Sequence, residues 1–175
     1  MVANKDERRQ QVIDVLNRAR SMEIMAISQY MNQHYALDDQ DFGSLAGNIK
    51  RIAIDEMRHA EMFAERIKDL SGEPTIKPAG DVTRGQDVRE VFPFDASLED
   101  NTIEAYNKFL QICRDCGDSV SSKIFETIIN EEQEHYLYFD DTGMHINTLG
   151  DYYLAKVAGT SSSIGETLSG FVAQK

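Results

Sequence analysis

The most constraining feature of the sequence is a Glu-x-x-His pattern that occurs twice. The segment "DEMRHAE" places Glu56 three residues before His59, and "NEEQEHYLY" places Glu132 three residues before His135. Positions three apart lie side by side on an α-helix, so each pair is expected to point in one direction. A single pair would carry little weight, but two copies in a chain of 175 residues need a joint explanation.

Two further glutamates extend the pattern into a repeat. Glu23 lies 33 residues before Glu56, and Glu99 lies 33 residues before Glu132. Matching residues of the two halves are each 76 positions apart; the pairs are Glu23 and Glu99, Glu56 and Glu132, His59 and His135, and Tyr30 and Tyr106. The spacing predicts two helix–helix hairpins, each of which contributes one glutamate and one Glu-x-x-His.

Hydrophobic periodicity predicts four long helices and a short fifth helix. They are expected at residues 5 to about 37, about 44 to 70, from Asp95 or Ser97 to about 115, about 119 to 145, and within "TLGDYYLAKVAG". All three prolines and three glycines fall between residues 72 and 93, which predicts a loop. An extended loop of that length can span a helix of ~40 Å. The predicted fold class is therefore all-α, a four-helix bundle with one long crossover and a short fifth C-terminal helix.

The bulk properties favour one domain over residues 1–159, followed by a flexible tail over residues 160–175 that is rich in small polar residues. No apolar run approaches the ~20 residues that span a bilayer, and the N-terminus has no apolar signal core, so a cytoplasmic protein is expected. The net charge of −12 argues against nucleic acid as a partner. It is compatible with attraction of cations, or with solubility alone.

The four glutamates lie on stripes that are predicted to face the core. Burying like charges without partners costs many kcal/mol or forces protonation, and no Lys or Arg occupies an equivalent inner position. Two divalent cations would balance four carboxylates, and one imidazole per metal suits iron or manganese rather than a thiolate zinc site. We therefore expect a two-metal site of the ferritin-like type. Its predicted ligands are Glu23, Glu56, His59, Glu99, Glu132 and His135.

Met57 lies about 100° around the helix from Glu56, on the predicted outer face. The residues near it on that face are small or apolar: Ala46, Ala53, Ile54 and Ala64. Such a face suggests a subunit interface, in which a methionine usually just packs. The alternative is an axial ligand, with Met57 from each chain of a two-fold dimer facing one haem iron.

Cys113 and Cys116 form a single Cys-x-x-Cys at the end of a helical pattern. A redox motif of this kind normally lies next to a strand. Because Cys113 falls on the apolar face of its helix, core packing is the expected role of this pair.

The sequence resembles the bacterioferritins. The resemblance is carried by "RARSMEIMAISQYMNQHY", "IDEMRHAEMFAERI" and "NEEQEHYLYF", and it extends from about residue 5 to 159, including "GDYYLAKVAG". A methionine directly after the glutamate of the first Glu-x-x-His separates this family from haem-free ferritins.

The resemblance implies a hollow homo-oligomer of 24 subunits, assembled from two-fold dimers. Each bundle would hold a ferroxidase centre of two irons that oxidises Fe(II) with dioxygen or hydrogen peroxide. The product would be stored as a ferric mineral, and an electron donor would release it. The implied roles are Glu23 and His59 on one iron, Glu99 and His135 on the other, Glu56 and Glu132 as bridges, and Met57 on a haem shared between two subunits. Tyr30 would either donate an electron or pack as a core aromatic.

One departure from the family concerns an accessory iron site on the inner surface, which some members build from a His and an Asp. Asp55 is present, but Arg51 occupies the position four residues before it. The rival functions are a rubrerythrin-like peroxidase, a di-manganese catalase, and a non-catalytic storage shell or haem-binding electron carrier. A rubrerythrin would normally carry a second module with two Cys-x-x-Cys pairs, and this chain has one pair.

Overall fold

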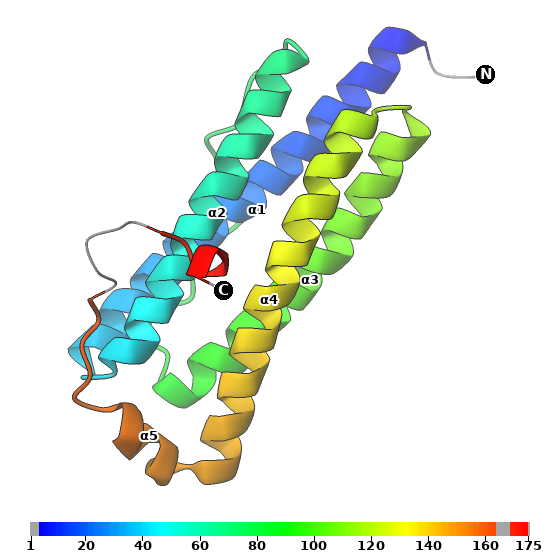
Figure 1. Cartoon of the computed structure of the whole chain (residues 1–175). Helices are drawn as coiled ribbons and strands as arrows, with labels where there is room; N and C mark the ends of the chain where they lie inside the picture. Colours follow the sequence, from blue (N-terminus) through cyan, green and yellow to red (C-terminus); the bar gives the residue numbers. More distant parts are fainter. Residues whose placement is uncertain (1–3, 164–168, 175) are drawn as a thin grey trace.

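The computed structural model describes residues 4–163 and 169–174, and within them the chain is all-α (Figure 1). The helices are α1 (Lys5–Asp39), α2 (Gly43–Asp69), α3 (Val88–Asp115), α4 (Ser119–Leu149), α5 (Asp151–Val157) and the 3-10 turn η1 (Val172–Gln174). The predicted fold class is confirmed. Among the described helices, none combines the length and apolar character needed to cross a membrane.

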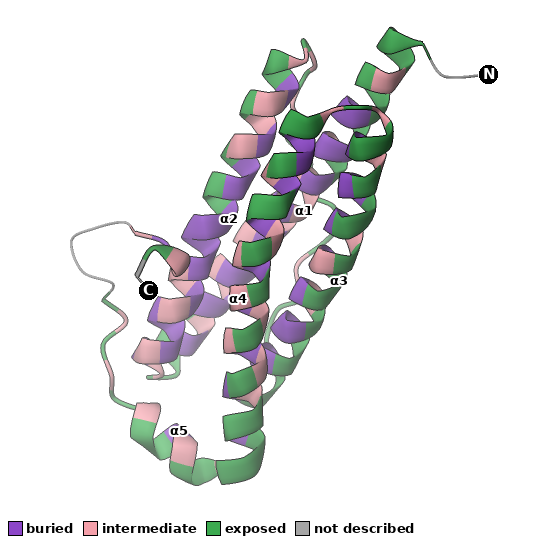
Figure 2. Ribbon diagram, turned by 45° about the vertical axis from the view of Figure 1, so that its right-hand side comes forward, coloured by how far each residue is buried: buried purple, intermediate pink, exposed green. Residues whose placement is uncertain are grey.

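The bundle is built from two antiparallel hairpins, α1 with α2 and α3 with α4 (Figure 1). Only residues 40–42 separate the first two helices, and residues 116–118 separate the second two. Buried residues line the inward faces of all four long helices, whereas the outward faces are exposed (Figure 2). The two predicted hairpins are thus present, and their apolar stripes face one another.

The core consists of two apolar clusters. One lies toward α5 and includes Tyr30, Phe92 and Phe139, and the other lies toward the opposite end and includes Phe63 and Phe125. Along each long helix, the predicted metal ligands fall between members of the two clusters. Apolar side chains therefore close the middle layer of the bundle at both ends.

The crossover between α2 and α3 covers residues 70–87 and lies along α1. The Thr75 N–H donates to Oδ1 of Asn17 at 2.7 Å, and Thr83 and Gln29 exchange two hydrogen bonds of 2.8 and 3.0 Å. Amide side chains of α1 thus satisfy backbone groups that would otherwise lack partners. The predicted crossover along the bundle is confirmed.

The start of α3 differs from the prediction. The helix begins directly after Asp87, which forms a capping box with Glu90, and it continues through Pro93. The predicted starts at Asp95 and Ser97 are therefore wrong. A proline within a helix removes one N–H···O bond, and here the capping box stabilises the first turn enough for the helix to begin before it.

Part of the C-terminal tail packs against the bundle. The Val172 N–H donates to Oδ2 of Asp55 in α2 at 3.0 Å. In Figure 1, η1 lies beside α2 and α4. Residues 164–168 lie outside the described part, and the flexibility of the tail stays a prediction.

Candidate metal centre

Six side chains meet in the middle of the bundle, and each is at most 2% exposed: Glu23, Glu56, His59, Glu99, Glu132 and His135. Their potential ligand atoms form two groups, and within each group these atoms lie within 4.8 Å of one another. The groups are Glu23, Glu56, His59 and Glu132, and Glu56, Glu99, Glu132 and His135. Glu56 and Glu132 belong to both groups. The structure thus brings together all six residues that the sequence singled out.

The two shared glutamates each lie between both imidazoles. Glu56 places Oε2 2.8 Å from Nδ1 of His59 and Oε1 3.2 Å from Nδ1 of His135. Glu132 places Oε2 3.0 Å from Nδ1 of His135 and Oε1 3.2 Å from Nδ1 of His59. Each histidine therefore directs Nδ1 toward the centre, and each shared carboxylate has one oxygen near His59 and the other near His135.

Two tyrosines form hydrogen bonds between the two hairpins at the centre. The Tyr30 hydroxyl donates to Oε1 of Glu99, and the Tyr106 hydroxyl donates to Oε1 of Glu23 at 2.5 Å. Each tyrosine thus holds the lone glutamate of the other hairpin. Burial, and then the facing carboxylate, raises the pKa of both phenols well above their usual range. Both side chains therefore stay protonated donors.

Two carboxylates outside the predicted set contact the histidines from behind. Glu131 places Oε2 3.1 Å from Nε2 of His59, and Asp55 places Oδ2 3.5 Å from Nε2 of His135. Each acidic residue directly precedes the glutamate of one Glu-x-x-His and reaches the histidine of the other. They are also 76 positions apart, so the repeat could have identified them. Such outer partners fix the orientation of a histidine and the tautomer that it adopts.

Asp55 does not lie on an open surface, as an accessory site would require. It is 1% exposed, and it also accepts a hydrogen bond of 2.9 Å from Arg58. Arg51 in turn donates to Asn48 at 3.4 Å. Asp55 and Arg51, the two positions of the accessory iron site found in some bacterioferritins, thus both have partners within α2.

The carboxyl groups of the centre differ in their pKa. Burial, and then the nearby Glu132 carboxylate, raises the pKa of both Glu23 and Glu99 well above the usual range. Burial would also raise the pKa of Glu132, but the neighbouring His59 and His135 lower it to about 2. In the metal-free protein, Glu132 therefore stays charged, whereas the two lone glutamates favour their protonated forms.

The histidines are held in the charged form. Burial by itself would lower the pKa of His59, but the charge of the Glu132 carboxylate and the hydrogen bonds that the ring donates to neighbouring carboxylates raise it well above the usual range. The Glu56 carboxylate has the same effect on His135. Protons thus occupy the space between the carboxylates in the absence of metal.

The donor set fits divalent cations. Oε1 of Glu56 and Oε1 of Glu132 are buried and form no hydrogen bond in the described part of the chain, although each lies 3.2 Å from the Nδ1 atom of a histidine. These are the oxygens that complete the contact of each shared glutamate with the second half of the site. Buried acceptors without a donor are costly unless a cation or a proton compensates them. Carboxylate and imidazole ligands of this kind suit iron or manganese.

Met57 points away from the centre and is 46% exposed. The prediction that Ala46 and Ala53 lie on the same outer face is wrong, because both are fully buried in the core. That side of α2 packs against α1: Nδ1 of His34 lies 2.9 Å from the Ala46 carbonyl oxygen. Alanines there allow the two helices to approach closely. A helical wheel gives the direction of a residue but not which neighbour lies there.

The cysteine pair has little thiolate character. Cys113 is fully buried, and burial, followed by the charge of Asp118, raises its pKa to about 12. Burial also raises the pKa of Cys116, whose thiol lies 3.2 Å from Oε1 of Gln11. Thiols held in the neutral form are poor nucleophiles, as expected for residues that serve packing.

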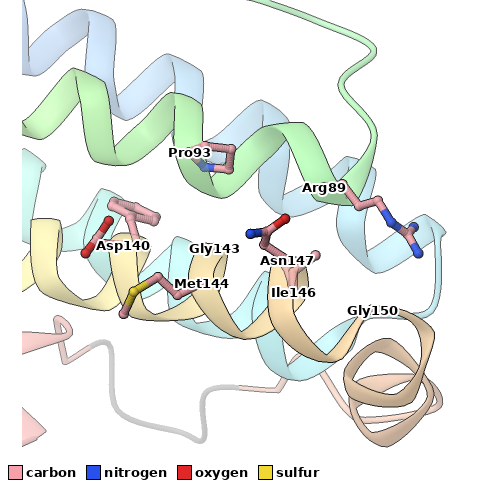
Figure 3. A pocket seen from close by; sticks show the side chains of 9 residues that line it. Arg89, Pro93, Asp140, Gly143, Met144, Ile146, Asn147 and Gly150 are labelled. Atoms are coloured by element: carbon pink, nitrogen blue, oxygen red, sulfur yellow. The ribbon is translucent and has the colours of Figure 1, made fainter.

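A groove of about 500 Å³ lies between the start of α3 and the end of α4 (Figure 3). Its lining residues are Arg89, Pro93, Phe139, Asp140, Gly143, Met144, Ile146, Asn147 and Gly150. None of the six candidate ligands lines it. The candidate centre is thus an ion-sized site inside the bundle, separate from this surface groove.

Comparisons with known proteins agree with the fold and the site. A family model described as "Ferritin-like domain" matches residues 13–147. A bacterioferritin of Desulfovibrio desulfuricans is 58% identical over 172 residues, which cover 98% of this chain and 96% of that protein. Bacterioferritin BfrA of Mycobacterium tuberculosis is 31% identical over 140 residues, which cover 80% of this chain and 88% of that protein.

Solved structures give the same result. An X-ray structure of the Desulfovibrio desulfuricans bacterioferritin, described as showing the diiron site in different catalytic states, has a TM-score of 0.93 and 57% identity. The match covers 94% of this chain and 96% of that chain. Mycobacterium tuberculosis BfrA has a TM-score of 0.81 and 30% identity, and the match covers 90% of this chain and 97% of that one. The chain therefore belongs to the bacterioferritins, a family built on the ferritin-like domain.

Proposed function

We propose that the protein stores iron: it oxidises Fe(II) to Fe(III) at a di-iron centre in each subunit and keeps the product as a ferric mineral inside a shell of 24 subunits. One observation carries this proposal. Two buried groups of three carboxylates and one imidazole share Glu56 and Glu132, which gives a pair of adjoining sites with two bridging ligands. The diiron site named for the Desulfovibrio desulfuricans relative supports the same assignment.

The ligands divide into two positions and a bridge. Glu23 and His59 would hold one iron, Glu99 and His135 would hold the other, and Glu56 and Glu132 would bridge them. When bound, the iron pair supplies the electrons that reduce dioxygen or hydrogen peroxide. The protein provides the geometry of the ligands.

The histidines are prepared for ligation by their outer partners. Glu131 faces Nε2 of His59, so the proton of the neutral ring is favoured on Nε2 and the lone pair of Nδ1 faces the centre. Asp55 has the corresponding position behind His135. Each histidine gives up its second proton when a metal binds, and the bridging carboxylates then lose the partners that they have in the metal-free protein.

Tyr30 has a second possible role beyond positioning Glu99. Its hydroxyl hydrogen faces that carboxylate, so loss of an electron from the ring would allow the phenolic proton to pass to Glu99. Tyr106 makes the equivalent contact with Glu23 in the other half. The two tyrosines therefore form a matched pair for testing this role.

A haem bound between two subunits is the further part of the proposal. Met57 is exposed, and its thioether is free of any role in the centre. Arg20 of α1 contacts the Ala60 carbonyl of α2, which places Ile24 and Ile27 level with the turns of α2 around Met57. Both isoleucines are partly exposed, so Met57 lies beside apolar surface. Met57 of each of two subunits would hold the haem iron through its thioether, and the haem would supply electron transfer to stored ferric iron.

Aerobic oxidation of Fe(II), followed by the absorbance of the ferric product, tests the proposal. Single substitutions Glu23→Ala, Glu56→Ala and Glu132→Ala should abolish the fast phase while the particle remains near 475 kDa, 24 times the 19.8-kDa chain. Glu126→Ala is a matched control, because Glu126 lies on the exposed face of α4. Unchanged rates in the three variants would refute the assignment. Release of dioxygen from peroxide without net oxidation of iron would instead favour a catalase.

A further inference from the structure

The two halves of the centre match in their ligands, their tyrosines and their outer carboxylates, but they differ in what covers those carboxylates. The Glu131 side chain, behind His59, is 32% exposed. The Asp55 side chain, behind His135, is only 2% exposed. The C-terminal segment Gly170–Val172 lies against Asp55.

Val172 and His135 approach the same oxygen atom. Oδ2 of Asp55 accepts the backbone N–H of Val172 at 3.0 Å, and the same Oδ2 lies 3.5 Å from Nε2 of His135. The other oxygen, Oδ1, accepts from Arg58 at 2.9 Å. Nε2 of His135 is buried and forms no hydrogen bond in the described part of the chain, so the 3.5 Å approach of Oδ2 is a charge contact. The carboxylate that faces this nitrogen is itself held by the tail.

Gly170 and Phe171 complete this covering. A Cβ added to Gly170 would lie 1.6 Å from Oδ1 of Asp55 and 2.6 Å from Nη1 of Arg58, so any larger residue must displace the segment. The ring of Phe171 lies 6.1 Å from the ring of His135 and 5.0 Å from that of Tyr138, measured between centroids. A backbone without a side chain and an aromatic ring together shield the outer edge of His135 from water.

We propose that Gly170–Val172 is a positioning strap for one of the two metal positions. Through Asp55 it fixes His135 and closes the outer side of the position formed by Glu99 and His135. Behind the position formed by Glu23 and His59 lies Glu131, which is partly exposed, and we expect this position not to depend on the tail. The two positions are therefore unequal, and the strap makes them so. This inference rests on the proposed di-metal centre.

The contact of Val172 with Asp55 can be broken by a single substitution. Val172 is the first residue of η1, where the φ of proline is tolerated, and Val172→Pro both removes the N–H donor and places the ring Cδ toward Oδ2 of Asp55, which must move away. Val172→Ala is the matched control, because it keeps the N–H and loses only the side chain. A chain ending at Leu168 removes the whole strap and serves as a second variant.

The measurement is a Co²⁺ titration of the metal-free 24-mer or smaller native assembly, followed by visible absorbance and calorimetry. The unaltered chain should bind two Co²⁺ per subunit. Val172→Pro and the truncated chain should bind one Co²⁺ as before and the other roughly 10- to 100-fold more weakly, the usual cost of losing an outer partner. Val172→Ala should behave as the unaltered chain.

Double variants locate the effect. Val172→Pro should add nothing to Asp55→Asn, because both act on one position, and should add fully to Glu131→Gln, which acts on the other. Two equal Co²⁺ affinities retained in Val172→Pro, or additivity with Asp55→Asn, would overturn the strap while leaving the di-metal centre in place. Binding of fewer than two Co²⁺ by the unaltered chain would overturn both the proposed centre and the strap.

Discussion

Metal binding should release protons, because the metal-free centre stores them. The pKa of His59 and the pKa of His135 both lie well above 6.5, so below that pH each ring carries two protons. A metal ion needs the lone pair of Nδ1, which faces the carboxylates, and must therefore displace one proton from each ring. Protonated Glu23 and Glu99 would each add one more.

The magnitude follows from the number of protons. Each displaced proton makes the binding constant fall tenfold per pH unit, so two protons give about 100-fold, or ~2.7 kcal/mol, for the pair of ions between pH 6.5 and 5.5. Since protonation opposes binding, affinity falls as pH falls. Four displaced protons would double the free-energy change.

The assay is a Co²⁺ titration of the metal-free protein with a pH indicator in weak buffer, repeated across this pH range. The account predicts release of two to four protons per subunit. His135→Ala should bind one ion fewer and release correspondingly fewer protons. Release of less than one proton per subunit, or an affinity independent of pH, would refute the description of the centre as a proton-filled carboxylate cluster.

Three further predictions concern the haem, the tyrosine pair and the core. Met57→Leu should lose haem absorbance yet keep Fe(II) oxidation, because the ligands of the metal centre are untouched. Retention of a full complement of bis-thioether haem would show that another residue is the ligand. Tyr30→Phe should slow the oxidation that follows the first turnover, as measured by stopped-flow absorbance. Tyr106→Phe removes the equivalent contact in the other half and is the matched comparison; equal effects would assign both tyrosines to positioning alone. Phe125→Ala should lower the free energy of unfolding by about 3–5 kcal/mol, because the ring is fully buried against three other rings. Guanidinium titrations of the metal-free protein measure this change, and a loss under 1 kcal/mol would contradict the close packing of that cluster.

The sequence predicted the arrangement of the site because the information is local and repeated. Glu56 and His59 share a helix face by spacing alone, and the 76-residue repeat places Glu132 and His135 in the same environment. Once four glutamates lie on inward faces, either protons or metal cations must balance their charge. The helix boundaries were harder to predict. Pro93 suggested a loop, whereas the capping box before it determines where α3 begins.

Other features depend on contacts between distant segments. Asp55 and Glu131 look like ordinary acidic residues on a helix until the second hairpin is placed beside the first. The contact of Val172 with Asp55 joins residues 117 positions apart, and periodicity carries no signal for it. Ala53 was assigned to an outer face because a helical wheel does not show on which side α1 packs. In all three cases, packing between segments that are distant in the sequence decides which residues a helix face contacts.

The central claim, that each subunit binds two irons between the named residues, is tested most directly by anomalous diffraction from crystals loaded with Fe(II) without oxygen. The account predicts two iron peaks per subunit inside the bundle, one beside Glu23 and His59 and one beside Glu99 and His135, with Glu56 and Glu132 between them. A single peak, or iron bound only outside the bundle, would contradict it.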